Sequence, residues 1–271
     1  MIGISKQAVN QYNKRQVTFD HLSMELVADA EMLRRAHPGC GVEKMYSTLR
    51  PTFIGRDRFI DMMMEAGFRL RRPKNYRRTT FSGKIHYPNL IKGMEVYAPN
   101  TIWQSDITYI QLGERFYYGV FIIDVYTKKI VGYKLSSHMR ASANLAALAE
   151  ALKNNPAPQI HHSDRGSQYG HKGYIDLLKT GNTKVSMGLK AQDNAYAERI
   201  NRTIKEEYLA HWKANCFTAL KKNVDNAVKH YNNNRQHNHL AKMTPTDFEK
   251  QWNTWPKHRR PRITIFDENN I

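Results

Sequence analysis

Apolar residues recur at helical spacing in the N-terminal part of the chain and predict two helices there. The first covers residues 6–12 and begins after Ser5, a residue that caps helix N-termini. The second covers residues 20–36 and ends at the breaker segment His37-Pro38-Gly39. Its apolar positions lie three and four residues apart: Leu22, Leu26, Val27, Met32 and Leu33.

Two shorter helices follow, over residues 42–49 and 56–66, with a break at residues 51–55 between them. Gly67 ends the second one. Short helices joined by tight turns are typical of a helix-turn-helix, which places one helix in the major groove of DNA. A small helical bundle without a DNA role has the same pattern, so both interpretations stay open.

From about Pro99 the pattern changes to that of a sheet. The near-continuous apolar run at residues 116–125 is typical of a strand buried on both faces. The predicted elements are strands at 101–111, 116–125 and 130–135, a helix at 141–153, a strand at 159–162, a helix at 174–179, a strand at 184–187 and a long helix at 193–209. This order predicts a mixed α/β layer architecture.

Composition narrows the class of partner. The chain has 271 residues, enough for two or three units, and a formal net charge of +18. Such a charge indicates a polyanionic partner, with nucleic acid first and an anionic membrane surface second. A basic surface kept only for solubility is the alternative. No apolar run approaches the ~18 residues of a membrane span, and no signal-peptide core is apparent.

The two cysteines, Cys40 and Cys216, lie far apart in the sequence. They predict neither a disulfide framework nor a cysteine-rich zinc site. We therefore expect a reducing, cytoplasmic setting, with the protein associated with the nucleoid.

The basic charge is concentrated in a segment after the helical region. Residues 69–84 contain seven cations and no acid: Arg69, Arg71, Arg72, Lys74, Arg77, Arg78 and Lys84. We predict a linker that lies along a DNA backbone, with binding that weakens steeply as salt rises. A solvated tether is the alternative.

Three acids occupy positions expected of catalytic acids. Asp106 lies inside a strand, in WQSDITYI, where propensity disfavours aspartate. Asp164 follows a short strand in HHSDRGSQY, a usual place for a functional loop. Glu198 lies on the long helix. Each alone has an ordinary interpretation: an edge residue, a turn former and a solvated helix residue.

The long helix has two distinct faces. One is polar: Asn194, Glu198, Asn201 or Arg202, and Lys205. The other is apolar and is expected to pack on the sheet: Tyr196, Ile200 and Ile204. A carboxylate among such polar neighbours suits a metal beside a phosphate backbone. We therefore predict DNA contacts for Asn194, Arg202 and Lys205, and for Arg165 beside Asp164.

Carboxylate oxygens are the ligands that hard divalent cations prefer. Three carboxylates are close to the minimum that holds two such ions for in-line attack on a phosphodiester. The three acids together therefore predict two Mg²⁺ (or Mn²⁺) ions.

Several segments resemble a known family. WQSDITYI, DVYTKKIVGY, HSDRGSQY and DNAYAERINRTIKEEYL resemble the integrase-core transposases of the insertion-sequence-three family, which are similar to retroviral integrases. AHPGCGVEKMYSTLR and MMMEAGFRLRRPKNYRR resemble that family's helix-turn-helix segment, and HYNNNRQHNHLAKMTPTDF resembles its C-terminal tail. The resemblance covers most of the chain.

The resemblance implies a ribonuclease-H-like integrase core, with a mixed five-stranded sheet, preceded by a helical DNA-binding domain. It implies a transposase in which Asp106, Asp164 and Glu198 are catalytic metal ligands and Lys205 contacts DNA. The implied partners are transposon ends and target DNA, further copies of the chain, and a separate first-frame DNA-binding protein. A nuclease that only hydrolyses and a regulator with an inactive core are the alternatives.

This sequence departs from the family pattern at two places. The stretch between Asp164 and Glu198 is slightly short, which predicts a shortened loop before the long helix. Gln236 stands where the tail motif usually has proline.

Other polar residues have mainly structural interpretations. We expect Asp124 to stabilise a turn, Asp193 to cap the long helix, and His161 and His162 to be structural. For the cluster of Arg235, His237 and His239 near Tyr231, a DNA-facing role and a structural one stay equally open. The basic tail at 257–262 is expected to be disordered when free.

These predictions divide the chain into four parts. They are a helical, helix-turn-helix-like region at 1–68, a basic linker at 69–98, a catalytic core at 99–213 and a C-terminal helical extension with a basic tail at 214–271.

Overall fold

The computed structural model describes residues 5–70 and 85–265 of the chain. The chain divides into two units, with the boundary between Pro73 and Lys74. Among the described residues, no helix is both long enough and apolar enough to cross a membrane.

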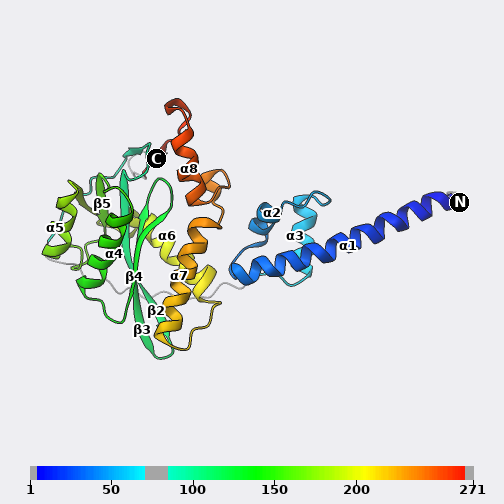
Figure 1. Cartoon of the computed structure of the whole chain (residues 1–271), viewed down its shortest axis with the longest axis horizontal. Helices are drawn as coiled ribbons and strands as arrows, with labels where there is room; N and C mark the ends of the chain where they lie inside the picture. The colour runs from blue at the N-terminus through cyan, green and yellow to red at the C-terminus, as the bar shows by residue number, and fades with distance from the viewer. Residues whose placement is uncertain (1–4, 71–84, 266–271) are drawn as a thin grey trace. The chain divides into compact units, whose positions relative to one another are not determined.

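The N-terminal unit consists of three helices, α1 (Lys6–Ala36), α2 (Val42–Leu49) and α3 (Arg56–Glu65) (Figure 1). They enclose a small apolar core in which Ala30, Met45, Phe59 and Met63 have no exposed surface. The bounds of α2 match the prediction, and those of α3 differ by one residue.

The prediction of two separate helices before His37 was wrong, because α1 runs through both. No glycine or proline interrupts residues 12–20, so nothing in the backbone ends the helix there. The capping role of Ser5 is confirmed, since its Oγ accepts a hydrogen bond of 3.2 Å from the Ala8 amide.

The second unit is built on a five-stranded sheet in the order β4-β3-β2-β5-β6. The strands are β2 (Ile102–Leu112), β3 (Arg115–Asp124), β4 (Ile130–Ser136), β5 (Ile160–Ser163) and β6 (Lys184–Met187). The pairs β2–β3 and β3–β4 are antiparallel, whereas β2–β5 and β5–β6 are parallel. The predicted mixed five-stranded sheet is therefore confirmed.

Helices cover both faces of this sheet (Figure 1). Val120 and Ile122 of β3 belong to the core that contains α4 (Ala141–Asn154) and α5 (Lys172–Thr180). Phe121 and Ile123 point the other way, into the core that contains α6 (Ala195–Thr203) and α7 (Phe217–Asn233). The two-residue repeat of a strand thus explains why β3 is apolar at nearly every position.

The long helix predicted over 193–209 is divided into three segments. A 3₁₀ turn, η1 (Ala191–Asn194), precedes α6, and a π-helix, η2 (Ile204–Leu209), follows it. The apolar face behaves as predicted, because Ile200 and Ile204 are buried against the sheet and Tyr196 packs beside them.

The C-terminal part packs on the same unit. It contains η3 (Asn238–Leu240), α8 (Pro245–Thr254), η4 (Lys257–Arg259) and β7 (Ile263–Thr264). Strand β7 pairs in antiparallel fashion with β1 (Glu95–Val96). The expectation of a disordered basic tail was wrong, because Tyr126 donates a 2.8 Å hydrogen bond to the Pro261 carbonyl and Arg260 lies 3.9 Å from the Trp252 ring centroid.

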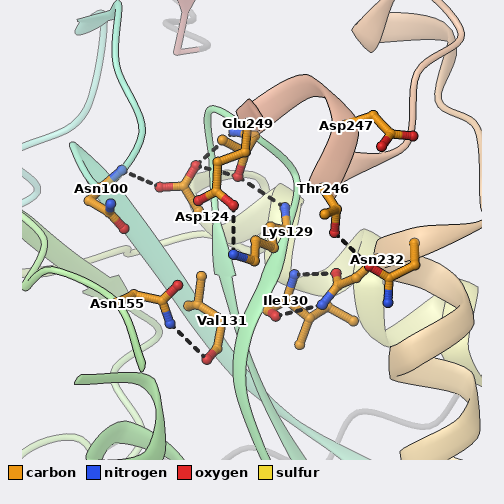
Figure 2. A network of polar contacts seen from close by, with 12 residues as sticks. Asn100, Asp124, Lys129, Ile130, Val131, Asn155, Asn232, Thr246, Asp247 and Glu249 are labelled. Carbon is orange, nitrogen blue, oxygen red and sulfur yellow. Dashed lines mark hydrogen bonds and ion pairs between the residues drawn. The ribbon is translucent and has the colours of Figure 1, made fainter. Parts of the chain in front are cut away.

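Polar contacts join α7 and α8 to the turn between β3 and β4 (Figure 2). Asn232 both donates to and accepts from the backbone of Ile130, at 2.9 Å each way. Lys129 and Glu249 form an ion pair of 2.6 Å. Asp124 is buried and accepts hydrogen bonds from the Thr127 and Asn100 amides. The predicted turn-stabilising role of Asp124 is therefore confirmed.

Candidate active site

The parallel pairing of β2 with β5 brings two of the predicted acids side by side. Ser105 of β2 pairs with Ser163 of β5; Asp106 is the next residue within β2, and Asp164 is the first residue after β5. Neighbouring strands lie about 4.8 Å apart, so the two aspartates are adjacent. Both side chains are half-buried.

Helix α6 carries Glu198 close enough to the two aspartates for their charges to interact. Asn201 lies one turn after Glu198 on the same helical face, and its amide donates a 2.8 Å hydrogen bond to Asp106 Oδ2. The backbone amide of Ile107 donates to Asp106 Oδ1 at 2.9 Å. Both oxygens of Asp106 are therefore held in a defined orientation.

The three carboxyl groups influence one another electrostatically. Burial, and then the charges of Asp164 and Glu198, raise the pKa of Asp106 to about 7, against the opposing effect of the hydrogen bonds from Ile107 and Asn201. Burial also raises the pKa of Asp164 and that of Glu198; for Glu198, Arg202 acts in the opposite sense and Asp164 adds to the increase. Such a group of like charges is relieved by a cation.

The three carboxylates match the donor chemistry of the divalent metal that the fold implies. Three carboxylates offer the hard oxygen ligands that Mg²⁺ and Mn²⁺ prefer, and their mutual repulsion favours a cation. Within residues 5–70 and 85–265, no set of three or more His, Cys, Asp or Glu side chains is gathered closely enough to hold a metal ion. The donor chemistry thus fits, while the carboxylates do not form a closed ligand group.

The residues near these acids that were predicted to contact DNA differ in how far their side chains are exposed. Lys205 is half-buried, and Asp106 raises its pKa against the larger lowering effect of burial, so its ammonium group is close to that carboxylate. Arg202 is exposed, and Arg165 is half-buried. Asn194 is only 3% exposed and donates to the Ser105 carbonyl at 2.9 Å, so its side chain is not presented at the surface.

The predicted basic linker lies mostly outside the described residues. Arg69 is described and exposed. The remaining linker cations are outside the described part of the chain: Arg71, Arg72, Lys74, Arg77, Arg78 and Lys84.

Two histidines that follow each other on β5 are structural, as expected. His161 Nε2 forms a hydrogen bond of 3.0 Å with the Tyr174 hydroxyl, and His162 Nδ1 forms one of 2.8 Å with Ser186 Oγ. Burial lowers the pKa of His161 to about 3 and that of His162 to about 4, so both rings are neutral near pH 7.

The cluster near Tyr231 is organised by an ion pair. Arg235 binds both oxygens of Glu207 on η2, at 2.7 and 2.8 Å, and only 11% of its side chain is exposed. The ring of His237 packs edge-on against Tyr231, whereas His239 is exposed. For Arg235, the DNA-facing alternative is therefore replaced by a structural role, because its guanidinium is already bound and largely buried.

Asp193 caps η1, the first segment of the predicted long helix, and not α6. Asp193 Oδ2 accepts from the Leu189 and Lys190 amides and so closes the short turn before η1. The first turn of α6 is instead capped by Gln104, which sequence reasoning missed. A signal was available, because Gln104 lies two residues before Asp106 and therefore on the same face of the strand.

Comparison with known proteins identifies the family. A model described as "Integrase core domain" matches residues 96–192, and a second model with the same description matches residues 182–245. A 31 kDa protein of insertion element IS600 from Shigella sonnei is 34% identical over 73% of this chain and 76% of its own length. The chain belongs to the integrase-core proteins of insertion sequences.

Other relatives in this family are described as transposases. The transposase of IS904 from Lactococcus lactis is 35% identical over 65% of this chain and 72% of its own length. Transposase InsF of IS3fB from Escherichia coli is 32% identical over 60% of this chain and 59% of its own. The resemblance to insertion-sequence-three transposases is thus confirmed, and the chain belongs to the family of insertion-sequence transposases.

The fold is also that of viral integrases. The structure of a simian T-cell lymphotropic virus intasome in complex with a PP2A regulatory subunit contains a chain that matches 78% of this chain and 70% of its own length, with a TM-score of 0.51 and 16% identity. At that identity the match concerns the fold alone, and it agrees with the predicted integrase core.

Proposed function

We propose that Asp106, Asp164 and Glu198 form the active site of a polynucleotidyl transferase. It would cleave a DNA phosphodiester at the transposon end and join the freed 3′-hydroxyl to target DNA. The observation that carries this proposal is the closeness of the three acids: Asp106 within β2 lies beside Asp164, which follows the neighbouring strand β5, and Asn201 ties the helix of Glu198 to Asp106.

The cofactor in this proposal is a pair of Mg²⁺ or Mn²⁺ ions held by the three carboxylates. When bound, such ions neutralise phosphate charge and activate an attacking oxygen. The chain orients the ligands: Ile107 and Asn201 hold Asp106, and the Gly166 amide donates to Asp164 Oδ1 at 3.0 Å. Catalysis would rest on positioning and charge, without a covalent enzyme intermediate.

The partner in this proposal is DNA, bound as transposon end and as target. Lys205, Arg202 and Arg165 are placed near the acids, and Arg69 belongs to the basic linker. We further propose that copies of the chain assemble on DNA, because two ends must be held together, and that a first-frame DNA-binding protein takes part. Association with the nucleoid would follow.

The organisation at 1–68, 69–98, 99–213 and 214–271 also remains our proposal, with DNA recognition assigned to the first part. The three-helix unit is compatible with a helix-turn-helix. The C-terminal part contributes α7 and α8, which pack on the same unit as the sheet.

A strand-transfer assay tests the function. The chain is incubated with labelled transposon-end DNA and Mg²⁺, and Glu198→Gln is compared with Glu150→Gln, a matched change on the exposed side of α4. We expect joined product from the wild type and from Glu150→Gln, and a loss of about 100-fold or more in Glu198→Gln.

The other two functions give different products in the same assay. Metal-dependent cleavage without joining would indicate a nuclease. Salt-sensitive DNA binding with no metal-dependent product would leave a regulator with an inactive core.

A further inference from the structure

The N-terminus of α6, the helix that carries Glu198, is not capped by the side chain of its own N-cap residue. The first N–H groups of a helix lack partners within it and are usually satisfied by the side chain of the N-cap residue. In α6 the N-cap residue is Asn194, whose side chain makes no capping bond. Its amide is turned to the strand instead, where it donates to the Ser105 carbonyl.

Gln104 of β2 supplies the missing cap from another element. Its Oε1 accepts hydrogen bonds from the Tyr196 amide at 3.1 Å and the Ala197 amide at 3.3 Å, the second and third positions of α6. Its Nε2 donates to the Asp193 carbonyl at 3.2 Å. The side chain is 1% exposed, so water does not replace these bonds.

The position of Gln104 links two of the three acids. It lies two residues before Asp106 on the same strand face, and one of its partners, Ala197, directly precedes Glu198. This buried amide therefore ties the first turn of α6 to the strand of Asp106, beside the bond from Asn194 to Ser105. Asn201 acts differently, because it binds the carboxylate itself, whereas Gln104 binds only backbone groups.

We propose that Gln104 is a positioning residue of the active site: by capping α6 from β2, it sets the placement of Glu198 relative to Asp106. This inference rests on the proposed function, since it assumes that the two acids work on one metal centre. The hydrogen bonds of Gln104 go to backbone groups at the start of α6, so it acts through the helix.

Three variants of the full chain test the inference. Gln104→Met has a similar volume but no capping oxygen. Gln104→Glu keeps an oxygen for the Tyr196 and Ala197 amides. Gln111→Met is the matched control, since Gln111 lies on the same strand but is exposed.

Two measurements are made on each variant: hydrogen exchange reports on the cap of α6, and Mn²⁺ binding reports on the placement of the carboxylates. Hydrogen exchange at the Tyr196 and Ala197 amides should be faster in Gln104→Met, because these groups lose their acceptor. Mn²⁺ binding in the absence of DNA should weaken about 10-fold or more, the size of effect seen when a supporting residue of a metal site is removed. DNA affinity at fixed salt should not change, and Gln111→Met should match the wild type in every readout.

Gln104→Glu should retain amide protection and bind Mn²⁺ more tightly than Gln104→Met. The proposal is overturned if Gln104→Met exposes the two amides but binds Mn²⁺ like the wild type, because the cap would then serve stability alone. If Gln104→Met does not fold, Gln104→Glu decides: protected amides with weakened Mn²⁺ binding would overturn the proposal, and wild-type binding would support it.

The failure of the proposed function is recognised separately. In that case the wild-type chain would show no metal-dependent product. If only the inference fails, the wild type is active and Gln104→Met resembles it.

Discussion

At the scale of single residues, the acids occupy unfavourable positions. Asp106 is half-buried beside Asp164 and Glu198, and these surroundings raise its pKa to about 7. A charge kept in such a place without a counter-ion destabilises the fold, which is common at functional sites. The residue is nevertheless held firmly, by the Ile107 amide and by Asn201.

Asp106→Asn should therefore stabilise the metal-free chain at pH 8. The raised pKa means that ionisation of Asp106 destabilises the fold as pH rises from about 4 to about 7, so the full penalty is present at pH 8. We expect a gain of about 1–2 kcal/mol in the free energy of unfolding, after allowance for partial exposure. Asn201 Oδ1 has no partner among the described residues. The Asn201 side chain can therefore turn so that this oxygen accepts a hydrogen bond from the amide group of the introduced asparagine.

The measurement is urea unfolding followed by tryptophan fluorescence. The control is Asp176→Asn, at an exposed position of α5, which should change little. The prediction is contradicted if the free energy of unfolding of Asp106→Asn does not exceed that of the wild type by more than the change seen in Asp176→Asn.

Lys128 is a second buried charge, in the turn after β3. Its ammonium group donates to the Val125 carbonyl at 2.6 Å and lies 3.9 Å from the Tyr196 ring centroid. Burial lowers its pKa to about 7, although Asp124 acts in the opposite direction and Arg199 adds to the lowering.

Between pH 7 and about 10, the unfolded chain should bind more protons at Lys128 than the folded chain does. The free energy of unfolding should therefore rise with pH, and Lys128 should contribute up to ~1.4 kcal/mol per pH unit to this increase. Lys128→Met should flatten that slope in unfolding curves at pH 7, 8 and 9. Lys134→Met, at an exposed position of β4, should leave it unchanged; equal slopes in both variants would refute the assignment.

At the scale of elements, the helix of Glu198 is anchored at both ends. Gln104 caps its first turn, and the π-helix η2 follows its last. Within η2, Glu207 pairs with Arg235, and the Tyr208 hydroxyl lies 3.1 Å from His230 Nδ1 of α7. π-helical segments occur often at functional sites, and this one directs two side chains to the C-terminal part.

Close packing between β4 and α4 depends on Gly132. A Cβ atom at this position would lie 2.7 Å from the Ala151 Cβ and would also meet the Ala147 carbonyl oxygen, which is backbone. Gly132→Ala should lower the free energy of unfolding by about 1–3 kcal/mol, because the helix must shift away from the strand.

Gly173→Ala is the control for that change. It lies inside α5, where the nearest atom would be 3.5 Å from the added Cβ. Its effect should be neutral or stabilising by up to about 1 kcal/mol. Thermal unfolding of both variants distinguishes the two cases, and equal midpoints would show that α4 yields without cost.

At the scale of the whole molecule, the chain consists of two units with separate cores. All four tryptophans belong to the second unit: Trp103, Trp212, Trp252 and Trp255. Tryptophan fluorescence therefore reports on the sheet unit alone, whereas circular dichroism reports on the helices of both.

Phe59→Ala should unfold the N-terminal unit selectively. Phe59 has no exposed surface in the three-helix core, and removal of such a side chain costs about 3–5 kcal/mol. We expect part of the helical signal to be lost at lower urea concentration, while the fluorescence midpoint stays that of the wild type. A fluorescence midpoint that moves together with the helical signal would show instead that the two units unfold as one.

Much of the fold was predictable because its signals are local. The apolar run of β3, the breaker after Ala36 and the bounds of α2 and β6 each follow from residues close in sequence. The acids were found in the same way, since Asp106 is unusual inside a strand and Asp164 ends one.

The sequence by itself determined the order of elements, the sheet class and the three candidate acids. Only the tertiary structure decided which distant groups meet. It placed Gln104 under a helix that begins about 90 residues later, paired Arg235 with Glu207, buried Asn194 and ordered the basic tail. The physical reason is that periodicity reveals which face of an element is buried, whereas hydrogen-bond and ion-pair partners are chosen by the packing of whole elements.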